Sequence, residues 1–249
     1  MKRPLFALAL AGLAAAPAQA FDLTSMTSQE QAAFRAEVRA FLLENPEVIM
    51  EAIHVLENRE AAQQAEMDKA MVTTNFEAIF NNSNSYVGGN PDGDITLVEF
   101  VDYRCGYCRK AHDEVAKLLE LDGNIRLIVK EFPILGEASV TSSRFAIAVK
   151  QVAGDAAYKA AANALIKLKS NPNEPVLRRL AGTLGVDADA VMARMDSDEV
   201  TEVIRESRIL GQRLSINGTP TFILQDQMLR GYLPLTNMLE LVERTREQG

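Results

Sequence analysis

The chain has 249 residues and a formal net charge of −8 at pH 7, with 47% hydrophobic and 24% charged residues. These values are typical of a globular protein that folds as one large domain or as a domain with an appendage. The acidity excludes nucleic acid as a partner, because such binding depends on basic side chains that neutralise phosphates.

Residues 1–20 have the pattern of a secretory signal peptide. Lys2 and Arg3 are basic, Leu5 to Ala15 form an apolar run, and Ala18-Gln19-Ala20 supply the small residues of a cleavage site. No later segment approaches about eighteen uninterrupted apolar residues, so the sequence predicts no membrane-spanning helix. We therefore expect an exported chain in an oxidising compartment.

Residues 21–85 are predicted to form an N-terminal helical region. Apolar residues recur at helical spacing on both sides of Asn45-Pro46, where the asparagine is a good helix cap and the proline suits a first helical turn. The apolar stripe consists of Phe34, Val38, Phe41, Leu42, Ile49, Ile53 and Leu56. Two interpretations stay open: the helices pack on the main domain, or they associate with other copies and make a homo-oligomer. Residues 81–94, rich in Asn, Ser and Gly, are predicted to be a linker.

From residue 86 to residue 249 the pattern predicts an α/β catalytic domain. A strand, a helix and a second strand form a βαβ unit, so the two strands should be parallel. A helical insertion at about 139–214 follows, divided at Gly154, Asn171-Pro172 and Gly185. A hairpin and a helix end the domain. The expected bounds are 95–103, 105–121 and 125–130 for the βαβ unit, 221–224 and 228–230 for the hairpin, and 235–246 for the last helix.

The chain has two cysteines, Cys105 and Cys108, and they lie where the first strand of the βαβ unit passes into its helix. At a helix N-terminus, unpaired backbone N–H groups and the helix dipole favour a thiolate over a thiol. Cys105 is therefore the predicted nucleophile. Cys108 is placed to attack the mixed disulfide that Cys105 forms and so to resolve it.

Other interpretations of this cysteine pair are less favourable. A structural disulfide across so short a loop removes little entropy from the unfolded chain. Structural zinc usually takes four ligands, whereas only Cys105, Cys108 and His112 are near one another in the sequence. Copper(I), which thiolates select, remains an alternative ligand. We interpret His112 as a solvated helix residue. Dithiol chemistry itself requires neither a metal nor a cofactor.

Three motifs in chain order resemble the DsbA-like thioredoxin-fold oxidoreductases of the bacterial periplasm. They are VEFVDYRCGYC from Val98, KEFPILG from Lys130 and GTPTF from Gly218. The stretch from Phe41 to Leu56 resembles the N-terminal region of the ScsC branch, the suppressor-of-copper-sensitivity type. The resemblance implies a thioredoxin fold interrupted by a helical domain and a periplasmic location.

The resemblance also implies roles for residues outside the cysteine pair. Thr219-Pro220 would be a cis-proline loop facing the cysteines, with the Thr219 backbone free to pair with a substrate strand. The residues alone favour a trans bond, since only about 5–6% of such bonds are cis. Glu99 takes the place of the buried acid that exchanges a proton with Cys108, and Lys130 that of its lysine partner.

The dipeptide between the thiols bears on the direction of the reaction. Gly106-Tyr107, together with Thr219, resembles the pairings of oligomeric periplasmic isomerases, whereas the strong oxidase of the family has Pro-His and a valine. Gly106 and Tyr107 are expected to contact substrate or to cover the disulfide. We therefore predict a thiol-disulfide isomerase or reductase that acts on proteins with cysteines or disulfides and is recycled by a membrane redox partner. A DsbA-like dithiol oxidase and a copper-binding or chaperone-like holding protein are the alternatives.

Overall fold

The computed structural model describes residues 25–248, so the predicted signal peptide lies outside the described residues. The chain divides into two compact units between Arg59 and Glu60. Helix α2 (Glu47–Thr74) contributes residues to both units, and the division predicted at residue 85 stays a prediction. Within residues 25–248, no helix is both long and apolar enough to cross a bilayer.

The N-terminal unit consists of α1 (Ser28–Glu44) and the beginning of α2. A capping box starts α1: the Thr27 side chain accepts a hydrogen bond from the Glu30 N–H, and the Glu30 carboxylate accepts one from the Thr27 N–H at 2.8 Å. Asn45, expected to cap the second helix, instead ends the first, since its side-chain amide donates to the Phe41 carbonyl at 2.9 Å. The predicted break between the two helices is confirmed.

A five-stranded sheet in the order β1-β3-β2-β4-β5 forms the centre of the C-terminal unit. The strands are β1 (Tyr86–Gly89), β2 (Ile95–Val101), β3 (Ile125–Glu131), β4 (Thr221–Leu224) and β5 (Gln227–Arg230). The predicted parallel pair, β2 with β3, and the predicted β4–β5 hairpin are both confirmed. Strand β1 lies inside the expected linker. It pairs with β3 antiparallel. The sequence did not predict it because two of its residues, Gly88 and Gly89, are of a type that is rare in strands.

Helices cover both faces of this sheet. One hydrophobic cluster joins the sheet to α4 (Gly106–Asp122) and α9 (Leu235–Gln248), and a second joins its other face to the end of α2, α3 (Phe76–Phe80) and α8 (Asp198–Arg213). Leu97 belongs to the first cluster and Val98 to the second, as expected from alternation along a strand. The result is a three-layer α/β fold of thioredoxin type with an inserted helical region.

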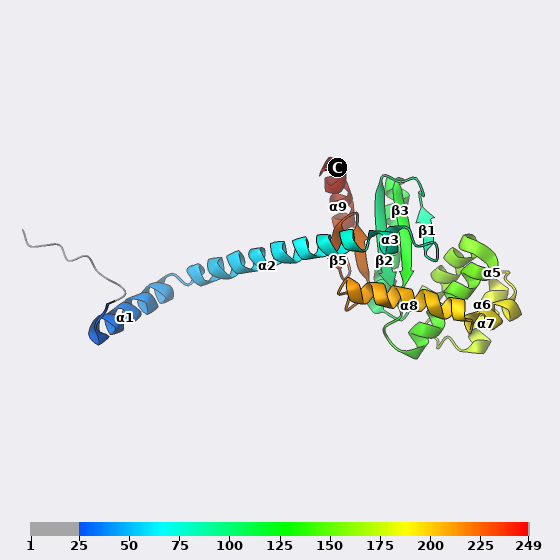
Figure 1. Cartoon of the computed structure of the whole chain (residues 1–249), viewed down its shortest axis with the longest axis horizontal. Coiled ribbons are helices and arrows are strands. Elements are labelled where there is room, and N and C mark those ends of the chain that lie inside the picture. The colour runs from blue at the N-terminus through cyan, green and yellow to red at the C-terminus, as the bar shows by residue number, and fades with distance from the viewer. Residues whose placement is uncertain (1–24, 249) are drawn as a thin grey trace, which may run out of the picture. The chain divides into compact units, whose positions relative to one another are not determined.

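The inserted region contains α5 (Glu137–Lys167), α6 (Glu174–Thr183) and α7 (Ala188–Met195). Figure 1 shows these three helices gathered together, with α8 returning the chain from them toward β4. Helix α5 is interrupted at Gly154, whose φ of 82° lies in the left-handed region that favours glycine. The break predicted at this glycine is therefore confirmed.

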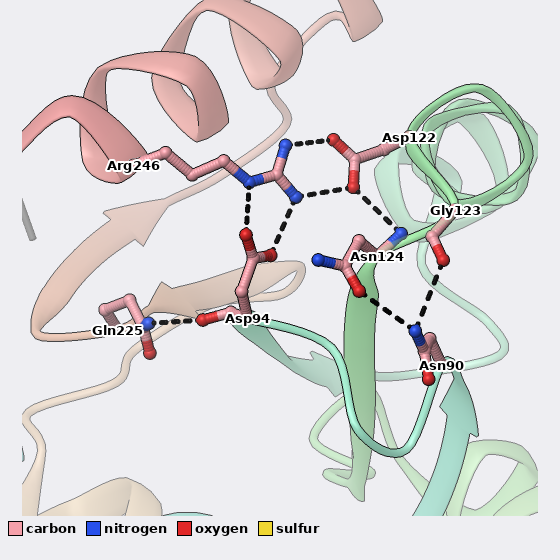
Figure 2. Close-up of polar contacts among 7 residues, drawn as sticks. All are labelled: Asn90, Asp94, Asp122, Gly123, Asn124, Gln225 and Arg246. Atoms are coloured by element: carbon pink, nitrogen blue, oxygen red, sulfur yellow. Dashed lines mark hydrogen bonds and ion pairs between the residues drawn. The ribbon is translucent and has the colours of Figure 1, made fainter.

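A cluster of polar contacts connects α9 with the C-terminal ends of β1, α4 and β4 (Figure 2). The Arg246 guanidinium donates two hydrogen bonds of 2.9 Å to Asp94 and bonds of 2.5 and 2.7 Å to Asp122. Asn90 donates to Asn124 at 3.0 Å, which adds the end of β1. The guanidinium lowers the pKa of both aspartates, so each favours its ionised form.

We predict that Arg246→Met lowers the free energy of unfolding by about 1 kcal/mol at pH 7, a modest value because solvent screens the partly exposed charges. The lowered pKa of both aspartates means that this contribution is present above their unfolded pKa and is lost as pH falls below about 3.9. Urea unfolding at pH 7 and pH 3 measures the difference. Arg244→Met removes the same charge from an exposed position of α9 and is the control. An equal loss of unfolding free energy in both variants would show that the contacts of Arg246 with Asp94 and Asp122 do not stabilise the fold.

Candidate functional site

The two thiols lie at the start of α4, as the sequence predicts. Cys105 is the N-cap residue of this helix, with an extended backbone (φ −75°, ψ 125°), and Cys108 is in the first turn. Both cysteines are free and buried, but Cys105 is 8% exposed and Cys108 is not exposed at all. An attacking substrate sulfur therefore reaches Cys105 first.

The loop before Cys105 is held by Asp102, which is fully buried. Its carboxylate accepts hydrogen bonds from the backbone N–H groups of Arg104 at 2.8 Å, Ile134 at 2.8 Å and Leu135 at 3.1 Å. Its carbonyl accepts from the Cys105 N–H at 3.1 Å. One side chain thus joins the cysteine loop to the loop after β3. The sequence motifs did not single out Asp102, although an aspartate directly after a strand is a usual turn former.

A second loop approaches the thiols from the start of β4. The Thr219–Pro220 peptide bond is cis, which confirms the expectation from the family resemblance. The Cys105 thiol donates a hydrogen bond to the Thr219 carbonyl at 3.1 Å. Pairing of Thr221 with Phe100 of β2 fixes this loop beside the cysteines. The Thr219 carbonyl, rather than its hydroxyl, is the group that contacts Cys105.

Glu99 lies on β2, on the sheet face that α4 covers, and is 5% exposed. Burial raises its pKa to about 7, and the nearby Glu131 carboxylate acts in the same direction. Burial also raises the pKa of Cys108, to which the charge of Glu99 contributes, whereas the Asp102 backbone and the Thr219 side chain lower it. Glu99 and Cys108 are therefore close enough for the charge of one to affect protonation of the other.

Lys130 does not pair with Glu99. In the parallel register, Glu99 is opposite Val129, so Lys130, the next residue, points to the other face of the sheet. There its ammonium donates to the Ala78 carbonyl at 2.7 Å, and burial lowers its pKa to about 8. The expectation of a lysine partner for Glu99 is therefore corrected: Lys130 contacts α3, and the residue of β3 that shares the thiol-side face with Glu99 is Glu131.

Glu131 is 4% exposed and accepts hydrogen bonds of 2.6 Å from the hydroxyls of both Tyr103 and Tyr158. Burial raises its pKa to about 7, and the two hydroxyls oppose this effect. Tyr158 belongs to α5, so this contact connects the inserted region to the site. No local pattern in the sequence predicts it, because the partners come from three separate segments.

A cavity of about 470 Å³ lies between the sheet, α4 and α5. Glu99, Tyr103 and Tyr158 contribute to its wall. His112 also lines it and is partly buried, which corrects the interpretation of this residue as a solvated one. Burial lowers the pKa of His112 and so favours the neutral imidazole.

The surface beside the thiols is open. Gly106 is exposed, and a side-chain carbon added to it would meet no atom within 4 Å. Tyr107 is 65% exposed. The centre of its ring lies 6.4 Å from the centre of the Tyr232 ring. The Lys110 ammonium lies over the Tyr232 ring, 4.2 Å from its centre. An aromatic and cationic surface of this kind suits contact with a polypeptide, the role expected for Tyr107.

A solvent-reachable cysteine at a helix N-terminus, a buried partner thiol and a buried acid define a thiol-disulfide oxidoreductase. Residues 96–243 match the family model of the DSBA-like thioredoxin domain, and the chain belongs to this family. Residues 30–63 match the model of the N-terminal domain of the copper resistance protein ScsC.

Solved structures share this fold. A thioredoxin-like oxidoreductase from Silicibacter pomeroyi DSS-3 is 39% identical, with 69% of this chain and 97% of that chain covered and a TM-score of 0.64. ScsC from Proteus mirabilis in a transitional conformation is 23% identical, with 92% and 100% covered and a TM-score of 0.65. Among curated proteins, 65% of the chain matches a Na(+)/H(+) antiporter NhaA from Herminiimonas arsenicoxydans at 24% identity, but the match spans only 25% of the antiporter.

We predict that Cys108→Ser accumulates mixed disulfides between Cys105 and substrate proteins, because the second thiol is no longer present to resolve them. Cys105→Ser should accumulate none, since the remaining thiol is fully buried. Acid quenching of cell extracts, alkylation of free thiols and non-reducing gels measure the adducts. Equal trapping by the two variants would contradict the assignment of Cys105 as nucleophile.

We also predict that Thr219→Val slows attack by Cys108 on a Cys105 mixed disulfide several-fold at pH 7. The Thr219 side chain lowers the pKa of Cys108, so its removal leaves less of the reactive thiolate. Stopped-flow release of glutathione from the Cys105 mixed disulfide measures the rate. Thr221→Val is the matched control, because it removes a nearby hydroxyl that donates to the Gly218 carbonyl at 2.9 Å and not to a thiol. A similar rate in both variants would remove Thr219 from the mechanism.

Proposed function

We propose that the protein is a periplasmic thiol-disulfide isomerase or reductase that works as a homo-oligomer. The observation that carries this proposal is the apolar surface of the N-terminal unit. Helix α1 has no buried residue, and Phe34, Phe41 and Leu43 are 46%, 52% and 65% exposed. So large an apolar surface on a two-helix unit favours burial against another chain.

A second copy of the chain is the partner that this surface suits. Within the N-terminal unit, α1 and the start of α2 enclose a groove of about 330 Å³ lined by Phe34, Val38, Leu42 and Ile49. Exposed phenylalanines of the same stripe have the size and chemistry to fill such a groove on another copy. The residues that match the ScsC N-terminal domain include this stripe, which supports a shared role.

The chemistry begins with attack of the Cys105 thiolate on a substrate disulfide. The substrate S–S bond breaks, a Cys105–substrate disulfide forms, and one substrate thiolate leaves. Another substrate thiol then attacks this mixed disulfide and releases a rearranged substrate, or Cys108 attacks it and releases a reduced one. Burial raises the pKa of Cys108, so Cys108 attacks only once its proton has passed to a base, and a substrate thiolate can attack first. This balance supports isomerisation.

The remaining residues have supporting roles in the proposal. Glu99 accepts the proton of Cys108 when Cys108 attacks. The Thr219 carbonyl, with Pro220 fixing the loop, aligns the substrate strand, and Tyr107 contacts it from the surface. After a reductive cycle Cys105 and Cys108 form a disulfide, so a membrane redox partner has to return them to the dithiol.

Two other functions use the same residues and are separated by activity. A dithiol oxidase would accept electrons from substrate thiols, and the position of Cys105 at a helix N-terminus also suits that direction. A copper(I)-binding protein would use the two thiols without turnover. Within residues 25–248, there is no group of three or more His, Cys, Asp or Glu side chains able to hold a metal ion.

We predict that Phe41→Asp converts the mature chain from an oligomer to a monomer, because a charge in the apolar stripe is costly to bury. The monomer should reduce insulin at a near-normal rate yet refold scrambled ribonuclease at least about tenfold more slowly. Light scattering coupled to size exclusion gives the mass. Ala36→Asp, which adds the same charge to an exposed position away from the stripe, is the control.

A wild-type chain that is monomeric at micromolar concentration would overturn the oligomer. Rapid oxidation of reduced substrates with no ribonuclease refolding would favour the oxidase instead. Substitution is preferable to truncation before residue 86, because the end of α2 belongs to the catalytic unit: Val72 lies in its core, and Asp68 accepts a hydrogen bond of 2.9 Å from Arg230.

A further inference from the structure

Two carboxyl groups, not one, are buried on the sheet face beneath the thiols. Glu99 is opposite Val129 in the parallel register, and Glu131 is opposite Val101, so the two glutamates point to the same face of neighbouring strands. They are 5% and 4% exposed. Two buried carboxylates on neighbouring strands repel each other, and they titrate as a coupled pair in which one keeps its proton to higher pH.

The hydrogen bonds decide which of the two is ionised first. The Tyr103 and Tyr158 hydroxyls both donate to the same oxygen, Oε1 of Glu131, at 2.6 Å. A carboxylate that accepts two such bonds is stabilised as the anion. Both donors are held in place. Tyr103 is buried in the loop that Asp102 holds, and the Tyr158 ring stacks on the Tyr86 ring with 4.7 Å between the ring centres. Glu131 is therefore ionised at lower pH than Glu99, which becomes a carboxylate only as the pH rises further and then acts as the base.

Other titratable groups line the cavity that Glu99 faces, but the charge that raises the pKa of Glu99 is that of Glu131. They are Tyr86 from β1, His112 and Glu120 from α4, and Lys159 from α5, with the buried Cys108 thiol close to Glu99. Burial favours neutral His112, and Glu120 and Lys159 are exposed at the edge, where water and salt screen them. Asp102, beside Glu131, accepts hydrogen bonds from backbone N–H groups, and its charge raises the pKa of Glu131; the hydroxyls of Tyr103 and Tyr158 act in the opposite direction.

We infer that Glu131 is a positioning residue for thiol-disulfide exchange: its charge, fixed by Tyr103 and Tyr158, makes Glu99 a strong enough base to take the proton of Cys108 near neutral pH. This inference rests on the proposed role of Glu99. In the step concerned, the Cys108 proton passes to the Glu99 carboxylate and the Cys108 sulfur attacks Cys105. The Cys105–Cys108 bond forms, the bond from Cys105 to the substrate sulfur breaks, and that sulfur leaves as a thiolate with the electron pair.

The decisive variant is Glu131→Gln, which keeps the shape and removes the charge. In the mature protein with glutathione bound to Cys105, the rate of glutathione release is measured by stopped flow from pH 5 to pH 9. Two changes are expected. The inflection assigned to Glu99 should move down by at least about one pH unit, because the repelling charge is gone. The plateau rate should fall about threefold, because a base of lower pKa accepts a proton less readily.

Two controls separate this inference from the proposed function. Glu99→Gln should remove the inflection, and the double variant should match it, because Glu131 acts only through Glu99. If Glu99→Gln leaves the profile unchanged, the proposed role of Glu99 is wrong. If Glu99→Gln removes the inflection but Glu131→Gln does not move it, the inference about Glu131 alone is wrong.

Tyr158→Phe keeps the inference testable if Glu131→Gln fails to fold. Loss of one donor makes Glu131 less readily ionised, so the inflection should again move to lower pH, by less than in Glu131→Gln. Tyr86→Phe, which alters the stacked partner of Tyr158 without touching the donor, is the matched control and should leave the inflection in place. An unmoved inflection in folded Tyr158→Phe would overturn the inference.

Discussion

The parallel register of β2 and β3 is the constraint on which the site depends. Pairing Glu99 with Val129 assigns every side chain of the two strands to one face or the other. Glu99 and Glu131 then face α4 and the thiols, whereas Lys130 faces α3 on the far side. A slip of one residue would place the buried lysine beneath Cys108 and would reverse the sign of the charge that the thiol meets.

The rest of the site is assembled on this frame from distant parts of the chain. The loop at Thr219 reaches Cys105 because β4 pairs with β2, and Tyr158 reaches Glu131 because α5 leaves the end of β3 and packs back over the same face. The inserted helices therefore do more than enlarge the protein. They supply the Tyr158 hydroxyl, which donates a hydrogen bond to the buried Glu131.

Much of this architecture follows from local sequence patterns. Strand and helix periodicity predicts the βαβ unit and the hairpin, and the cysteine spacing predicts the thiol chemistry of Cys105 and Cys108. The cis bond at Pro220 came only from resemblance, because the residues themselves favour trans. Strand β1 was missed because two of its four residues are glycine.

The wrong expectation about Lys130, and the absence of any about Glu131, have a different physical origin. A motif identifies neighbours along the chain, whereas the face on which a side chain lies depends on pairing with another strand. The Glu131 cluster combines residues of β3, α5 and the cysteine loop, so it is defined only when the helical insertion has packed.

Asp102 has a consequence for how such a protein can diversify. Its carboxylate holds the loop after β3 through the backbone N–H groups of Ile134 and Leu135, and it makes no demand on their side chains. Those side chains are 38% and 54% exposed, so either can change while the backbone anchor stays in place. The surface at this edge is thus free to evolve, or to be engineered, without loss of the anchor that holds the cysteine loop.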